Sequence, residues 1–548
     1  MRPLFALALL AASTPAAAKT VAAPAPTPPA TAPQLGRVTF PVTGPEVAQK
    51  HFQRGLLALH SFWYEEARDE FQAATKAAPE FAMGYWGEAL TYYHPIWEQE
   101  DVVKSKAALD KLPAALNVTG REKMYIDAAR ELLGEAPREA RWKRYADAMR
   151  ALHVRYPDDD EAATLYAVAL LGSVGRKTPG FKLQAEAGAI GLEVLSRNPD
   201  HPGAAHYIIH AFDDPDHAVL ALPAARRYAQ IAPEAHHARH MPSHIFVQLG
   251  MWNEAAASNE SSWAASDAWV KRKGGDVTFH DYHSLQWLQK IAIEQGRYKR
   301  ADEVLALAKS DLDNAKNQRA MVRLTYASLA VDNAVSTDAI ERVEALLAPL
   351  AKPEPPSTET SAVGGCHSPA EVASAQRIAR LEQGVHAYAR GLLALAKKDL
   401  EGVNKAAATL ADIQTKIPDA AWRDGLRQSE LELRGRRAAQ LGKVEDALTK
   451  LRASVQLEER EPPSGPVYGV TARERLGEVL LANRRAPEAL ATFRRALELH
   501  PRRARVLLWA SKAAAQAGDA AAAAAYRAEL GQVWAGGDEA QRRLVDAK

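Results

Sequence analysis

One spacing recurs along this chain and constrains its fold more than any other feature. The window that opens at Ala48 has small residues at positions 8 and 20, an aromatic residue at 24, alanine at 27 and proline at 32, namely Gly55, Ala67, Phe71, Ala74 and Pro79. The window that opens at Val470 repeats this pattern with Gly477, Ala489, Phe493, Ala496 and Pro501. Between these positions, apolar residues recur three and four apart, as amphipathic helices require. The spacing predicts repeated pairs of helices.

These residues resemble the tetratricopeptide repeat, a helix–turn–helix unit of 34 residues. Small residues at positions 8 and 20 allow the two helices to approach closely, the residue at 24 fills the space between them, and proline at 32 ends the second helix. The resemblance implies an all-α fold, an α-solenoid of stacked hairpins. It also implies that positions 2, 5, 9, 12 and 13 of each first helix line a concave groove. The alternative is a helical bundle of Ala-rich hairpins.

The beginning of the chain is typical of an export signal. Residues 1–18 contain one early cation, Arg2, then a short apolar stretch and a run of alanines that fits a small-x-small cleavage site. Residues 19–46 are rich in Ala, Pro and Thr, and we expect them to form a disordered tether. The sequence therefore predicts a periplasmic or secreted bacterial protein, and the alternative is an Ala-rich start on a cytosolic one.

Composition excludes several classes of protein. The 69 basic and 67 acidic residues nearly balance, which gives no reason to expect a nucleic-acid partner. The single cysteine, Cys366, excludes an internal disulfide and Cys-rich metal sites. The apolar stretch of the signal is too short to span a bilayer, so we expect no transmembrane segment. Phosphate-binding glycine loops, serine-hydrolase elbows and dinucleotide fingerprints are absent from the sequence.

A change in composition divides the repeats into two arrays. Residues 352–370 are rich in Pro, Ser and Gly with few apolar residues, which indicates a linker. The sequence thus predicts an irregular N-terminal array over residues 47–351 and a more regular C-terminal array over residues 371–548.

Histidines are concentrated in the N-terminal array and follow the repeat frame. Ten of the 17 lie between residues 201 and 283. His206 and His240 occupy position 5 of two successive units, and His210 and His244 occupy position 9. The resemblance places these positions in the groove. Other candidate groove residues are His237 at position 2, Asp213 at position 12, His94 at position 13 of an earlier unit, and Tyr92 and Trp97 beside it.

This spacing predicts a metal site. Two histidines four apart on a helix have Cβ atoms about 5–6 Å apart on one face, so both imidazoles can reach one ion. Adjacent helix axes lie roughly 8–10 Å apart. We therefore expect His206 and His210 to share one point with His240 or His244 from the next unit.

Three further residues belong to this prediction. His280 and His283 either join the site or form a second one, and Asp213 serves as a ligand or accepts a hydrogen bond from a ring N–H. The abundance of imidazole and the lack of thiolates favour zinc or copper. Met241, next to His240, tilts the choice toward copper.

Two alternatives to a metal stay open. The histidines could cap helices and hydrogen-bond between repeats, or form a catalytic network without metal. Pro242 between His240 and His244 also predicts that a helix starts there with His240 outside it, which weakens the expected pairing.

Two classes of function follow from the sequence. The first is an exported scaffold that binds a protein or peptide in the groove. The second is a metal-binding protein or metal-dependent enzyme that uses the histidine-lined part of the groove. The H-Y-x-x-H and H-M-P-S-H segments resemble those of exported bacterial repeat proteins, and this resemblance implies no catalytic residues.

Overall fold

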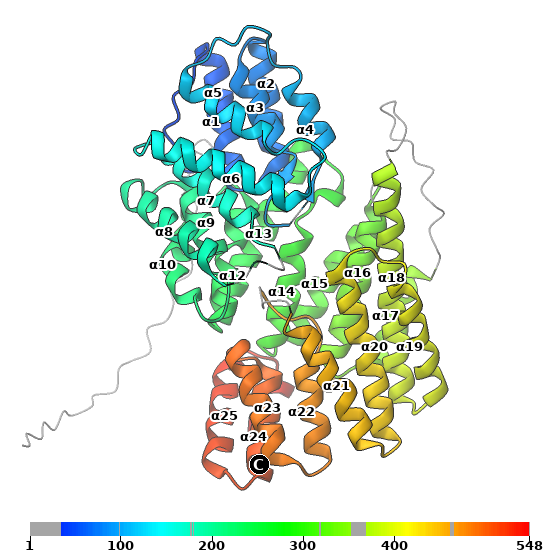
Figure 1. Cartoon of the computed structure of the whole chain (residues 1–548). Coiled ribbons are helices and arrows are strands. Elements are labelled where there is room, and N and C mark those ends of the chain that lie inside the picture. The colour runs from blue at the N-terminus through cyan, green and yellow to red at the C-terminus, as the bar shows by residue number, and fades with distance from the viewer. Residues whose placement is uncertain are drawn as a thin grey trace, which may run out of the picture. The chain divides into compact units, whose positions relative to one another are not determined.

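The computed structural model describes residues 34–97, 99–175, 178, 180–316, 319–351, 369–460 and 465–546 (Figure 1). The predicted signal, most of the predicted tether and nearly all of the predicted linker lie outside these residues.

The regular structure of the described residues is almost entirely helical, as predicted. The elements before the predicted linker are α1 (Glu46–His60), α2 (Tyr64–Ala77), α3 (Ala82–Leu90), β1 (Tyr93–His94), β2 (Gln99–Glu100), α4 (Val102–Leu109), α5 (Gly120–Arg130), α6 (Arg138–Arg155), α7 (Asp160–Gly172), α8 (Lys182–Arg197), α9 (Pro202–Ala211), α10 (Ala218–Ile231), α11 (His236–His240), α12 (Pro242–Gln248), α13 (Trp252–Lys273), η1 (Val277–Phe279), α14 (Tyr282–Glu294), α15 (Tyr298–Asn314), α16 (Arg319–Ser336), η2 (Ile340–Arg342), α17 (Val343–Leu347) and η3 (Ala348–Leu350). The elements after it are α18 (Pro369–Ala396), α19 (Leu400–Gln414), α20 (Ala420–Gln440), α21 (Val444–Glu458), α22 (Ala472–Ala482), α23 (Ala486–Leu499), α24 (Ala504–Gln516), α25 (Ala520–Val533) and α26 (Glu539–Asp546). The two short strands pair antiparallel.

Consecutive helices pack as hairpins, and the predicted small residues lie at their contacts. A Cβ atom at Gly55 of α1 would lie 2.9 Å from the ring of Phe71 in α2. In the same way, a Cβ atom at Gly477 of α22 would lie 2.5 Å from the ring of Phe493 in α23. Both rings are fully buried. Position 8 is therefore small because the side chain at position 24 fills the space beside it.

The prediction of a tether over residues 19–46 is wrong for its last part. Residues 34–45 precede the first helix, and Leu35, Val38, Phe40 and Val42 are buried. The Phe40 ring packs on that of Phe52, with the centroids 5.5 Å apart. These apolar side chains bury enough surface to order a segment that Pro-rich composition alone marks as flexible.

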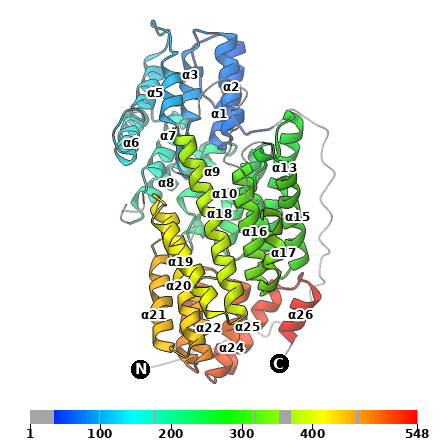
Figure 2. The same cartoon turned by 90° about the vertical axis from the view of Figure 1, so that its right-hand side faces the viewer.

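The two predicted arrays share cores and ion pairs, so they are less separate than the sequence indicates. Helices α16 and α18, on either side of the predicted linker, pack side by side (Figure 2) and contribute to one hydrophobic cluster. Farther along, Arg503 before α24 pairs with Glu294 at the end of α14, at 2.7 Å. The indole N–H of Trp252 donates to the Arg502 carbonyl at 3.0 Å.

No helix among the described residues combines the length and the apolar character needed to cross a bilayer.

Candidate metal centre

The first helices of two successive repeats bring three histidines together. His206 and His210 lie one turn apart on α9, and His237 lies on α11. One ring nitrogen from each of the three lies within 4.8 Å of the others. The Nε2 atoms of His206 and His210 are 3.0 Å apart. We call these three residues the inner triad.

Hydrogen bonds fix the nitrogens that face the centre of the inner triad. His206 Nδ1 donates to the backbone carbonyl of His60 at 2.7 Å, so its Nε2 carries a lone pair directed at His210. His237 Nε2 is buried and has no hydrogen-bond partner among the described residues. Since a buried polar atom without a partner costs free energy, a proton or a cation at the centre of the inner triad would satisfy this nitrogen.

A second group of three histidines follows directly. His240 ends α11, His244 lies in α12, and His283 lies near the start of α14. One nitrogen from each again lies within 4.8 Å of the others. Pro242 does begin a helix, as predicted, yet the Nε2 atoms of His240 and His244 still meet at 3.1 Å. We call these residues the outer triad.

In two rings of the outer triad, the nitrogen that faces away from the centre donates a hydrogen bond to a side-chain oxygen. His240 Nδ1 donates to the side-chain oxygen of Asn259 at 2.7 Å, and His244 Nδ1 donates to the Asp213 carboxylate at 2.6 Å. Because each Nδ1 carries its proton, both Nε2 atoms present lone pairs to each other unless a proton or a metal ion lies between them. This pattern, with one nitrogen directed inward and the other bound to an oxygen acceptor, is that of metal-ligating histidines.

Burial keeps most of these rings uncharged at neutral pH. It lowers the pKa of His206 to about 3 and lowers the pKa values of His210, His237 and His240 well below their usual range. The neighbouring imidazoles lower these pKa values further, because adjacent cations repel. Neutral imidazole is the form that binds metal.

Aromatic side chains pack against the histidines of both triads. Phe62 has a positive φ of 51° and packs its ring 4.3 Å from that of His206. Trp287 of α14 lies 4.7 Å and 4.3 Å, between centroids, from His240 and His244. Phe62 and Trp287 do not belong to the predicted set, because the repeat frame gives no signal for them.

The three predicted aromatic groove residues divide into two groups. The Trp97 ring lies 5.4 Å from that of His237 and borders the inner triad, whereas the His94 ring lies 6.0 Å from that of Trp97, one ring farther away. Tyr92 instead lies beneath the guanidinium of Arg68 at 4.5 Å.

Two other predicted residues have roles that differ from that of a ligand. Asp213 orients His244, which is the second of its two expected roles. His280 does not join His283, because it lies after η1 in extended backbone, and its Nδ1 bonds the Asp311 carboxylate at 2.7 Å.

The expectation that His206 and His210 share one point with His240 or His244 is also wrong, since each pair gains a third histidine of its own. Met241 is fully buried in the hydrophobic core.

A third group, His60, Glu161 and His201, is complete without a metal. All three side chains are fully buried. Glu161 accepts from His60 Nε2 at 2.6 Å and from His201 Nε2 at 3.1 Å. The remaining nitrogens are occupied by the Tyr207 hydroxyl and the Ala204 N–H. The histidine pair in turn lowers the pKa of Glu161 against its burial, so this group is a buried structural network.

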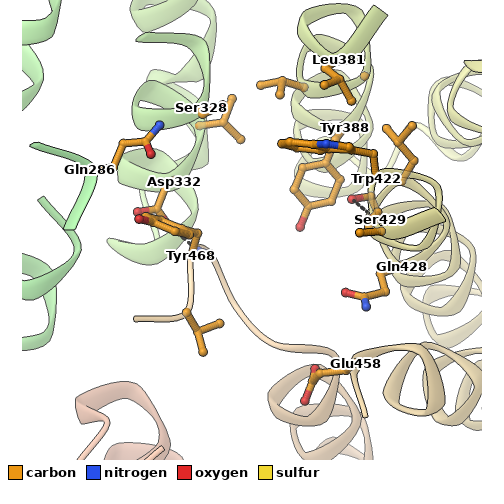
Figure 3. Close-up of a pocket in the computed structure, with 18 of the residues that line it drawn as sticks. Gln286, Ser328, Asp332, Leu381, Tyr388, Trp422, Gln428, Ser429, Glu458 and Tyr468 are labelled. Carbon is orange, nitrogen blue, oxygen red and sulfur yellow. Dashed lines mark hydrogen bonds between the residues drawn. The ribbon is translucent and has the colours of Figure 1, made fainter. Parts of the chain in front are cut away.

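The outer triad opens into a large cavity. His283 is exposed and lines a cavity of about 1720 Å³, together with Trp97. Helices α14, α16, α18 and α20 and the segment that follows residue 464 form its walls, with Asp332 and Tyr468 on one side and Tyr388 and Trp422 on the other (Figure 3). A ligand in this cavity can therefore reach the outer triad.

The same small-residue contact recurs at a third hairpin. A Cβ atom at Gly435 would lie 3.0 Å from Leu451, at the positions equivalent to those of Gly477 and Phe493. The chain has the tetratricopeptide-repeat fold. Its candidate metal centre lies at positions 2, 5 and 9 of two repeats, with His283 from the next first helix.

Comparisons with known proteins find only low similarity. No family model and no curated protein matches the chain. Similar solved structures include the human IFIT1 dimer with PPP-AAAA, with 12% identity, 87% of this chain and 89% of that chain covered, and a TM-score of 0.36. Another is the APC/C hetero-tetramer Cut9-Hcn1, with 10% identity, 85% of this chain and 76% of that chain covered, and a TM-score of 0.35. A tetratricopeptide repeat protein from Parabacteroides merdae has 9% identity, 62% of this chain and 100% of that chain covered, and a TM-score of 0.27.

Proposed function

We propose that this repeat protein binds transition-metal ions in its two triads, at the wall of the cavity. The arrangement of His240 and His244 carries the proposal. Their outward nitrogens donate to Asn259 and Asp213, and their inward nitrogens face each other at 3.1 Å. A metal ion bound by both rings satisfies the two lone pairs at once, and His283 supplies a third ligand.

The ligand set favours zinc or copper. All six candidate ligands are imidazoles, which suit these borderline ions better than calcium or magnesium. Three protein ligands leave a coordination position for water or a ligand, as in catalytic rather than structural zinc sites. Since the outer triad borders the cavity, its open position is accessible from there.

Metal analysis of the full chain without a histidine tag tests this proposal. We expect the protein, after native purification or titration with zinc or copper, to hold about one ion for each triad. His240→Ala should remove the ion from the outer triad, because it deletes one of three ligands. His280→Ala is the matched control, since the His280 side chain is only 7% exposed and bonds a carboxylate but lies outside both triads.

Circular dichroism should show unchanged helix content in both variants. A parent protein that takes up neither ion, or a control variant that loses as much metal as His240→Ala, would contradict the proposal.

A peptide-binding scaffold is the second candidate function, and the cavity favours it. Its volume of about 1720 Å³ exceeds the roughly 300–1,000 Å³ of small-molecule pockets. Trp422 is 51% exposed and lies across from Tyr468 (Figure 3). Aromatic side chains of this kind act as anchors in peptide and protein recognition. The charged lining residues are mainly acidic, namely Asp332, Asp419, Glu432, Glu458 and Glu459 against Arg377 and Arg495, which disfavours a nucleic acid.

Selection from a random peptide-display library tests the scaffold. Peptides that bind the cavity should bind at least about tenfold more weakly to Trp422→Ala, because the exposed indole is the main apolar anchor. Leu441→Ala is the control, since Leu441 is 41% exposed but does not line the cavity. Binding that is insensitive to Trp422→Ala would place the peptides elsewhere.

A further inference from the structure

The two triads are close enough to act on each other. The rings of His210 and His244, one from each triad, have centroids 6.0 Å apart. The rings of His237 and His240 are also 6.0 Å apart, and both lie on α11. This short helix therefore supplies one ligand to each triad, so the ions of the two triads would be neighbours rather than separate sites.

Among the described residues, no carboxylate faces the centre of either triad. Neither triad includes a carboxylate. Asp213 bonds the outward side of His244, and Asp281 bonds His236 and the Ser284 hydroxyl. Two divalent ions surrounded by neutral imidazoles in a buried place repel each other strongly. An anion between them offsets this repulsion, and the three-histidine sets leave open positions for it.

The surroundings restrict the source of that anion. The Phe62 ring covers His206, and the Trp287 ring covers His240 and His244. The exposed His283 is the triad residue that lines the cavity. A small ligand from solvent therefore reaches the ions through the cavity and past His283.

We propose that the two triads form one coupled dicopper site, in which a small exogenous anion such as hydroxide bridges the two ions. The proposal rests on the proposed metal-binding function and adds the identity of the metal and the bridge. Copper binds nitrogen ligands more tightly than zinc. Copper can also bind as copper(I), and two copper(I) ions bring half the positive charge of two divalent ions into the neutral triads.

Electron paramagnetic resonance of the full-length protein loaded with two equivalents of copper(II) sulfate tests the coupling. Mass spectrometry first confirms that two coppers bind. A bridging anion couples the two unpaired electrons antiparallel, so we expect a doubly integrated signal far below that of two independent coppers. His283→Ala removes a ligand from the outer triad and should leave one copper with the full signal of one spin. The variant thus binds less copper than the parent but gives the stronger signal.

One control variant and two contrary outcomes make the experiment decisive. His280→Ala should behave as the parent does, in both copper content and signal. A parent with two coppers and the full signal of two spins would overturn the coupling while leaving the metal sites in place. A parent that binds no copper, or only copper that His283→Ala and His206→Ala both leave unchanged, would overturn the sites themselves.

Discussion

Gly477→Trp is expected to unfold the C-terminal repeats or to destabilise them by about 3 kcal/mol or more, the upper range for an overpacked core. A Cβ atom at this position would already lie 2.5 Å from the ring of Phe493, which is fully buried. An indole cannot fit unless α22 and α23 separate. Urea unfolding followed by circular dichroism measures the loss.

Gly425→Trp is the matched control. Gly425 lies within α20, and a Cβ atom there has no neighbour within 4 Å. This substitution should change the unfolding free energy little. Equal unfolding curves for the two variants would show that the contact between positions 8 and 24 does not hold the hairpin together.

Arg503→Met is expected to destabilise the protein by about 3–5 kcal/mol, the cost of removing one partner from a buried ionic network. The Arg503 side chain is almost fully buried and bonds Glu474 at 2.6 Å, Glu294 at 2.7 Å and the Gly469 carbonyl at 2.7 Å. Methionine fills much of the volume but leaves both buried carboxylates without this cation. Thermal unfolding at neutral pH measures the effect.

Arg495→Met provides the comparison, because its ion pair with Glu498 at 2.8 Å is exposed on both sides. Exposed pairs contribute about 0–1 kcal/mol. If the two variants melted at the same temperature, the link from α14 to the C-terminal repeats would be unimportant for stability.

The sequence predicts the hairpins well because their contacts are local and repeat. Position 8 meets position 24 within one unit, so Gly55 with Phe71 and Gly477 with Phe493 can be read from spacing. The links between distant parts have no such signal. Arg503 and Glu294 are far apart in sequence, and only the folded chain shows their contact.

The histidine pairs were also predictable, since His206 with His210 and His240 with His244 follow from the four-residue period. The third histidine of each triad was less predictable. His237 and His240 lie three residues apart on α11 and yet belong to different triads. His283 is helical and reaches the outer triad, whereas His280 precedes the helix, so spacing alone could not place the two residues.

Residues 34–45 show where composition misleads. The proline-rich segment before them predicts disorder, but four apolar residues of this stretch, among them Val38 and Phe40, are buried in the hydrophobic core. The group of His60, Glu161 and His201 was equally hidden, because it joins α1, α7 and the residue before α9 without a common spacing.

The contact between Gly465 and Trp287 determines when, during translation, the outer triad becomes enclosed. Gly465 has a φ of 101°, and a Cβ atom there would lie 2.3 Å from the indole of Trp287, the ring that covers His240 and His244. A growing chain that has emerged only through α21 has all six triad histidines but lacks this cover. One face of Trp287 is then bare, and the outer triad reaches its final enclosure only when the last repeats are translated and docked.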